Sequence, residues 1–169
     1  MLYSAPASLK RRFAALCYEG LLLAAVSAAA AVFSGVLVTF LPDVPVLAKL
    51  AVSVSFLAAW WWYCQTNWRR GQTLPMKVWR IHLQNTAGQP PNRLQLRMRF
   101  IWACLFLVLI PLLAYWALRH ADIAAKQAVF AALLWWILPW GFAFFNLQRQ
   151  FLYDYLAGTV LMSDVAKAE

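Results

Sequence analysis

The sequence contains few ionisable side chains for its length. Of its 169 residues, 12% are charged and 64% are hydrophobic, and aspartate and glutamate together number only 6. A soluble domain of this size carries more charge, because polar residues must cover its apolar core. The shortage of charge therefore excludes an ordinary soluble domain and indicates a protein whose solvent is the lipid bilayer.

Groups that carry enzymatic chemistry are also scarce. The two histidines, His82 and His120, are expected on opposite sides of a membrane, and Cys17, Cys64 and Cys104 show no metal-ligand spacing. No nucleophile has a base beside it, and the stretch GQTLPMK lacks the spacing of a phosphate-binding loop. We therefore expect no enzyme activity, no metal and no cofactor.

The apolar residues are gathered into long runs. A bilayer core of roughly 30 Å takes about 20 helical residues, and four runs approach that length: Leu21–Phe40, Val46–Cys64, Phe100–Leu118 and Ala128–Phe145. Pro111 and Pro139 interrupt the last two runs. Neighbouring helices in a membrane bundle can satisfy the carbonyl groups that a proline frees, so we expect kinks rather than breaks. The predicted fold class is all-α, a polytopic membrane protein with four transmembrane helices in a single domain over residues 1–169.

Basic side chains lie mainly on one side of the predicted spans. Twelve of the 15 lysines and arginines precede the first run, lie between the second and third runs, or follow the fourth. They are Lys10, Arg11, Arg12, Arg69, Arg70, Lys77, Arg80, Arg93, Arg97, Arg99, Arg149 and Lys167. The positive-inside bias places this side in the cytoplasm. Both termini and the basic segment 66–99 are therefore predicted to be cytoplasmic.

Two interpretations of the basic segment remain open. Alternating polar and apolar residues over 77–83 and again over 93–99, with the turn-forming stretch NTAGQPPN between them, are typical of a short β-hairpin. Alternatively, the residues from Arg93 onward form the first turns of the third membrane helix, with their arginines at the lipid headgroups. We favour the helix for this later half, because nothing separates Arg99 from the apolar run that follows.

Three stretches of the chain resemble a known family. They are RRFAALCYE (Arg11–Glu19), GQTLPMKVWRIHL (Gly71–Leu83) and RQFLYDYLAGT (Arg149–Thr159), and together they resemble the RDD family of bacterial membrane proteins. The arginine and two acidic positions that give the family its name correspond to Arg12, Glu19 and Asp154. Further residues of the matching motifs are Gly71, Gln72, Thr73, Lys77, Gly158 and Thr159.

The resemblance implies a small multi-pass protein of the bacterial inner membrane, in a family linked with transport. This chain departs from the family pattern at two places. Glu19 stands where the family has aspartate, which keeps the charge and lengthens the side chain by one methylene. Tyr153 stands where histidine commonly precedes the second aspartate, so the resemblance supports no proton relay through that ring.

The three charged motif residues are expected to form a cluster at the cytoplasmic helix ends. Arg12 and Glu19 are seven residues apart, so on one helix they fall within about 20° of each other. Asp154, after the fourth run, could lie beside them and neutralise Arg12. The cluster is interpreted either as a clamp that fixes the helix ends or as an ion or proton site. The middle of all four runs contains no carboxylate, histidine or arginine, which favours the clamp.

Two functions of different classes follow. The first is transport, as cation/proton exchange by an oligomer. The alternative is a non-catalytic scaffold or assembly factor that binds a protein partner or anionic phospholipid through its basic face, with lipid contacts from Arg69, Arg70, Arg80, Arg93, Arg97 and Arg99. The expected partners are the bilayer, its anionic lipids and a second copy or another membrane protein. Nucleic acid is not expected.

Overall fold

The computed structural model describes residues 5–40 and 45–163. Four helices are long and apolar enough to cross a membrane: Leu9–Val38, Pro45–Trp68, Arg93–His120 and Ala125–Phe145. The first two are α1 and α2. The third is made of α4 (Arg93–Cys104), a π-helical turn η1 (Leu105–Leu109) and α5 (Ile110–His120). The fourth comprises α6 (Ala125–Leu133), a 3-10 turn η2 (Leu134–Trp136) and α7 (Ile137–Phe145). The predicted helical class with four spans is confirmed.

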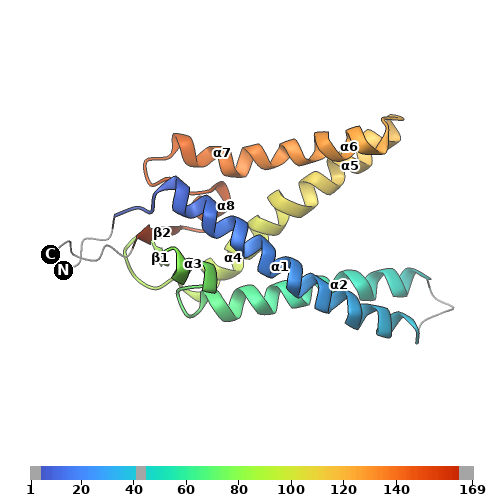
Figure 1. Ribbon diagram of the computed structural model, residues 1–169, viewed down its shortest axis with the longest axis horizontal. Coiled ribbons are helices and arrows are strands. Elements are labelled where there is room, and N and C mark those ends of the chain that lie inside the picture. The colour runs from blue at the N-terminus through green and yellow to red at the C-terminus, as the bar shows by residue number, and fades with distance from the viewer. Residues whose placement is uncertain (1–4, 41–44, 164–169) are drawn as a thin grey trace.

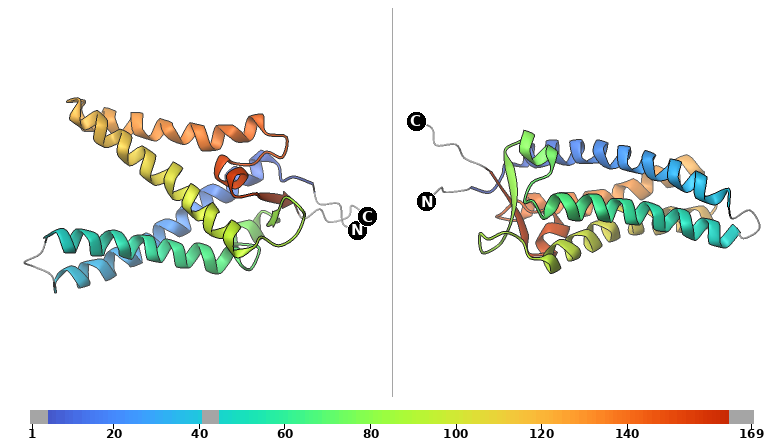
Figure 2. Two further views of the ribbon diagram at one scale, coloured as in Figure 1. Left: turned by 180° about the vertical axis from the view of Figure 1, so that it is seen from behind. Right: turned by 90° about the horizontal axis from the view of Figure 1, so that it is seen from below.

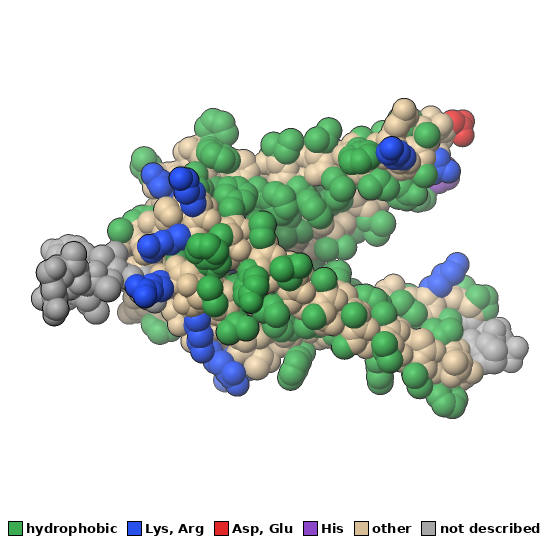
Figure 3. All heavy atoms as spheres, in the orientation of Figure 1, with side chains coloured by type: hydrophobic (Ala, Val, Ile, Leu, Met, Phe, Trp, Pro, Cys, Tyr) green, Lys and Arg blue, Asp and Glu red, His purple; other side chains and the backbone are tan. Residues whose placement is uncertain are grey.

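The four spans form two arms that meet at one end of the molecule. In Figure 1, α1 and α2 make the lower arm, and α5, α6 and α7 make the upper arm. We call the end where residues 5 and 163 lie the terminal end, and the end where α1 and α5 finish and α2 and α6 begin the turn end. The arms separate toward the turn end, and Figure 3 shows apolar side chains over both of them. Lysine and arginine side chains gather mainly at the terminal end in the same view.

Two of the spans begin earlier than the apolar runs predict. The first helix starts at Leu9 instead of near Leu21, and the third at Arg93 instead of Phe100. At Arg93 the cause is a capping box, in which Asn92 and Gln95 each accept a hydrogen bond from the other's backbone N–H. The helical interpretation of the later half of segment 66–99 is therefore confirmed. Lys167, assigned above to the basic side, lies outside the described residues.

A small cap closes the terminal end. It consists of the short helices α3 (Leu74–Val78) and α8 (Leu152–Leu156) and the strands β1 (Ile81–Asn85) and β2 (Thr159–Ser163). The strands pair antiparallel, with Leu83 opposite Leu161, and the chain around Pro6 forms a bridge on the other side of β2. Figure 2 shows this cap from behind and from below. The hairpin interpretation of segment 77–99 is wrong, because β1 pairs with a strand near the C-terminal end of the chain.

The two interrupting prolines change the local helix type without breaking the spans. A π turn precedes Pro111 and a 3-10 turn precedes Pro139. Pro111 has no N–H for the Leu107 carbonyl four residues earlier. The indole Nε1 of Trp136 donates to that carbonyl at 3.0 Å. The fourth span therefore satisfies the carbonyl that the proline frees in the third.

Candidate functional site

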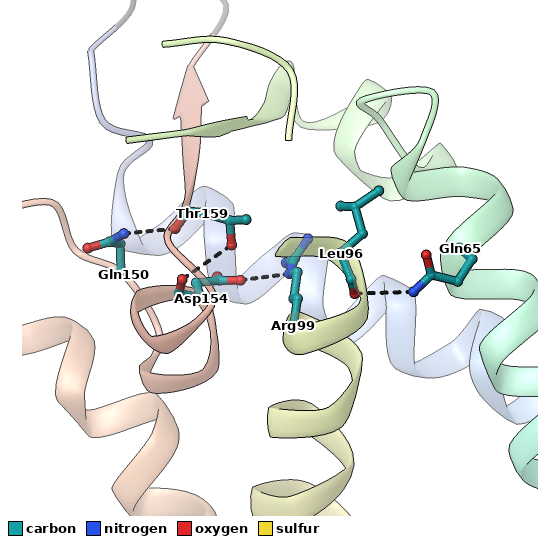
Figure 4. Close-up of polar contacts among 6 residues, drawn as sticks. All are labelled: Gln65, Leu96, Arg99, Gln150, Asp154 and Thr159. Atoms are coloured by element: carbon teal, nitrogen blue, oxygen red, sulfur yellow. Dashed lines mark hydrogen bonds and ion pairs between the residues drawn. The ribbon is translucent and has the colours of Figure 1, made fainter. Parts of the chain in front are cut away.

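A buried ion pair links the third span to the cap. Arg99 of α4 places its Nε 2.7 Å from Oδ1 of Asp154 in α8, and their side chains are 5% and 0% exposed. Figure 4 shows the two side chains meeting between these helices. The Arg99 guanidinium also lies over the ring of Trp68 in α2, 4.5 Å from its centroid. This one arginine thus joins three elements through its charge and its flat face.

The turn after α8 holds Asp154 in place. Gly158 has φ +64°, a conformation that favours glycine, and its carbonyl accepts a hydrogen bond from Gln95 Nε2 at 3.1 Å. The Thr159 hydroxyl donates to the Asp154 carbonyl at 3.3 Å, and Gln150 Nε2 donates to the Thr159 carbonyl at 2.7 Å. Figure 4 shows both contacts of Thr159. The motif residues Gly158 and Thr159 therefore hold the turn that positions Asp154.

Burial and charge act in opposite directions on the groups of α8. Burial raises the pKa of Asp154, and the charges of Arg99 and Arg12 lower it. The effect of burial is the larger, so the pKa of Asp154 lies above its ordinary value. Burial, followed by the charge of Asp154, raises the pKa of Tyr153 well above its ordinary value. Tyr153 therefore stays protonated at physiological pH and cannot replace a titrating histidine.

Arg12 is fully buried and is held mainly by backbone carbonyls. Its Nε donates to the Ala7 carbonyl at 3.0 Å, and its NH2 donates to the carbonyls of Gln148, at 2.9 Å, and of Leu161. These contacts join the N-terminal segment, the α7–α8 connection and β2. The expectation that Asp154 is the direct partner of Arg12 is corrected, because the ion pair of Asp154 is with Arg99. Arg12 is still close enough to lower the pKa of Asp154.

Glu19 contacts the motif that follows α2. Its Oε2 accepts a hydrogen bond from the Thr73 hydroxyl at 2.7 Å. The same hydroxyl caps α3 by accepting from the Met76 N–H at 3.4 Å. Within the described part of the chain, Glu19 Oε1 and the Tyr63 hydroxyl are buried with no hydrogen-bond partner. One oxygen of Glu19 is therefore held by Thr73, and the carboxylate also interacts with the buried Tyr63 hydroxyl of α2.

The other motif residues of the stretch Gly71–Leu83 shape the connection from α2 to β1. Gly71 has φ +77° and its carbonyl accepts from the Leu83 N–H at 2.9 Å. Gln72 Nε2 donates to the Ile81 carbonyl at 3.1 Å. Lys77 lies exposed in the last turn of α3. Gly71, Gln72 and Thr73 thus have structural contacts that position the cap over Glu19, whereas Lys77 faces outward.

A cavity of about 200 Å³ lies between the charged residues and the apolar spans. Its walls come from α1, α2, α4, η1 and the cap. Its charged lining residues are Arg12, Glu19 and Arg99, and its aromatic ones are Trp60, Trp68, Phe100, Phe151 and Tyr153. Asp154 is not part of the lining. Arg12 and Arg99 each have an NH1 atom with no hydrogen-bond partner among the described residues.

The arginines proposed above to contact lipid divide into two groups. Five of them are exposed at the terminal end: Arg69, Arg70, Arg80, Arg93 and Arg97. Arg99 is only 4% exposed, and its pairing with Asp154 removes it from the lipid-contact set. Sequence reasoning therefore missed Arg99 as a site residue. The helical spacing of Leu96, Arg99 and Phe100 was the available signal, since these three form the buried face of α4.

A family model described as the RDD family matches residues 6–158. The matched range covers Arg12, Glu19, Arg99 and Asp154, together with α3, β1 and α8 of the cap, and it ends just before β2. No curated protein and no solved structure matches the chain significantly.

Proposed function

The chain belongs to the RDD family, a membrane protein family, and from this premise we propose that it exchanges a cation for a proton at Glu19. One observation carries the proposal. Glu19 is the acidic residue, among those that the structure describes, that lines the cavity. Asp154 is engaged by Arg99 instead. Glu19 lies within the first of the four membrane-length helices, and ionisable groups in such helices are costly and commonly mark transport sites.

The charge of the site suits a one-for-one exchange. Arg12 and Arg99 carry two positive charges, and Asp154 and ionised Glu19 carry two negative charges, so their sum is zero. A proton on Glu19 gives the site one positive charge, and a monovalent cation bound to ionised Glu19 gives the same. The site therefore has the same net charge in its two loaded forms, which supports exchange without an added electrostatic cost.

Replacing Glu19 with glutamine tests this proposal. The amide keeps the acceptor for Thr73 but removes the charge, so we expect a folded protein that has lost exchange. The measurement is proton movement in proteoliposomes carrying a pH-sensitive dye, after a cation is added outside. The matched control is Glu19→Asp, which keeps the charge and is expected to keep part of the activity. Undiminished exchange by Glu19→Gln would rule out Glu19 as the exchange site.

We propose that the terminal end faces the cytoplasm of a bacterial inner membrane and that the protein acts as a homo-oligomer. The excess of basic residues at that end supports the orientation, and the separation of the two arms leaves apolar surface that a second copy would cover. A cysteine placed at Asn85 in a variant without native cysteines should be protected from impermeant thiol reagents in intact cells. Labelling from outside would contradict the orientation. Light scattering of the purified protein measures the mass of the complex.

A scaffold that holds anionic lipid is the second candidate, and the five exposed arginines favour it. Basic residues near a membrane surface attract anionic lipid by about 1 kcal/mol each. A double Arg69→Gln, Arg70→Gln variant should therefore bind phosphatidylglycerol bicelles about thirtyfold more weakly than the wild-type protein. The control is Lys126→Gln, at the turn end. Equal binding by all three proteins would show that the basic surface does not recruit lipid.

A further inference from the structure

Two buried arginines present hydrogen-bond donors to the cavity. Arg12 is 0% exposed and Arg99 is 4% exposed, and both line the cavity. Each has an NH1 group that lacks a hydrogen-bond partner among the residues that the structure describes. Nε of Arg99 is paired with Asp154, which is not part of the lining. A buried guanidinium N–H without an acceptor has a large desolvation cost, so both NH1 groups favour an acceptor supplied by a ligand.

The carboxylate of Glu19 does not supply that acceptor. Glu19 lines the cavity, but its Oε2 accepts from the Thr73 hydroxyl, and its carboxylate also interacts with the Tyr63 hydroxyl. It lies seven residues beyond Arg12 on α1, which is roughly 10 Å along the helix axis. The charge next to the two unpaired NH1 groups is therefore positive, and the ligand that suits them is an anion.

The charged and apolar parts of the cavity lie at different depths in the membrane-length spans. Arg12 is the first lining residue of α1 and Arg99 is the first of α4, and both helices run from the terminal end toward the turn end (Figure 1). The later lining residues of these two spans are mainly apolar and include Leu16, Leu23, Ala103, Leu107 and Val108. The cavity therefore has a cationic end near the cap and an apolar end within the spans.

The size and position of the apolar end suit one hydrocarbon chain. Val108 is 38% exposed, and Leu23 and Trp60 are half-buried, so this end of the lining reaches the apolar surface of the arms (Figure 3). The volume of about 200 Å³ is below the roughly 300–1,000 Å³ of pockets that enclose a drug-sized ligand. It has room for a small headgroup and the first part of one chain, whose remainder extends along the spans. A phospholipid, with two chains and a glycerol, needs more space.

We propose that this cavity binds a single-chain amphiphile with a carboxylate headgroup, which is the chemistry of a long-chain fatty acid. The two carboxylate oxygens accept hydrogen bonds from NH1 of Arg12 and NH1 of Arg99. Such charge-assisted hydrogen bonds are the strong ones between arginine and carboxylate. The alkyl chain lies against the apolar walls. The inference goes beyond the exchange proposed at Glu19 and does not rest on it.

A brominated fatty acid, dibromostearate, is a suitable probe for this site. Its bromine atoms quench tryptophan fluorescence on contact, and Trp60 lies in the apolar part of the lining. The purified full-length protein in a nonionic detergent is titrated with the probe, and the fluorescence is measured. We expect saturable quenching that oleate reverses by competition. Methyl oleate has the same chain without the charge and should compete at least tenfold more weakly.

Two changes of charge test the role of the arginines. The double variant Arg99→Met, Asp154→Leu removes one NH1 donor together with the buried partner of that arginine, so no charge is left alone. It should bind the probe at least tenfold more weakly than the wild-type protein. Glu19→Gln keeps both arginines and removes the negative charge from the lining. It should bind the probe at least as tightly as the wild-type protein.

A change of volume locates the chain independently of charge. Ala103→Leu fills part of the cavity and should weaken binding at least tenfold. Its matched control is Ala117→Leu, on the exposed face of the same span, which should bind as the wild-type protein does. This pair keeps the test valid if the double variant does not fold.

Specific outcomes would overturn the inference. Quenching that rises without saturation, or equal competition by oleate and methyl oleate, would show partition of the chain alone. Binding that is unchanged in both the double variant and Ala103→Leu would place the probe elsewhere, and a tenfold loss in Glu19→Gln would show that the site prefers a cation. If phosphatidylglycerol displaces the probe as well as oleate does, the ligand is a phospholipid and the fatty-acid assignment is wrong.

Discussion

Replacing Asp154 with asparagine is expected to destabilise the protein by about 3–5 kcal/mol. The change leaves the Arg99 guanidinium buried with no opposing charge, and breaking a buried pair from one side has a cost of this size. For a chain of this length, each kcal/mol lowers the melting midpoint by roughly 2–4 °C. The midpoint of the detergent-solubilised protein, measured by size-exclusion chromatography after heating, should therefore fall by about 6–20 °C.

The control for this change is Asp122→Asn. Asp122 is exposed at the turn end and has φ +57°, a conformation that asparagine also tolerates, so its midpoint should stay close to wild type. A double variant, Arg99→Met with Asp154→Leu, removes both charges and should recover much of the lost stability. If Asp154→Asn melts at the wild-type temperature, the ion pair does not anchor the cap.

Replacing Arg12 with lysine is expected to have the second large effect on stability. Arg12 reaches the carbonyls of Ala7, Gln148 and Leu161 in different directions through the planar guanidinium. A single ammonium cannot reproduce this fork, although it keeps the charge. Losing about two hydrogen bonds to a charged group corresponds to about 3–5 kcal/mol. The same melting measurement applies, and hydrogen exchange should show faster exchange over residues 159–163.

The matched control is the neighbouring residue Arg11. Its side chain is exposed and contacts the Ser163 hydroxyl at 2.8 Å, and surface changes of this kind are usually within about 0.5 kcal/mol. Arg11→Lys should therefore leave both the midpoint and the exchange of β2 almost unchanged. Equal behaviour of the two lysine variants would mean that the carbonyl contacts of Arg12 contribute little.

These predictions assign different roles to the motif residues. Arg12, Arg99 and Asp154 fix the cap to the helix ends, as the clamp interpretation of the cluster requires. Glu19 lines the cavity, as an ion or proton site requires. We therefore predict that the two interpretations of the cluster apply to different members of it, and the melting and exchange experiments test them independently.

The site was only partly predictable from the sequence. Arg12, Glu19 and Asp154 were identified through their motifs, and their placement at one end followed from the spans. The partner of Asp154 was not predictable, because Arg99 stands among exposed arginines and resembles a headgroup contact. Its role depends on the position of α8, which is set by the pairing of Ile81–Asn85 with Thr159–Ser163. Nothing local to either segment specifies that pairing.

The sequence by itself determined the solvent, the number of spans and the side on which the basic residues lie. These properties depend on the composition and length of each segment, since insertion into lipid is decided largely by each helix alone. The tertiary structure decided which charge meets which, and which acid lines the cavity. Those outcomes depend on contacts between distant segments, such as Thr73 with Glu19 and Arg99 with Asp154, and such contacts form only when the cap folds over the helix ends.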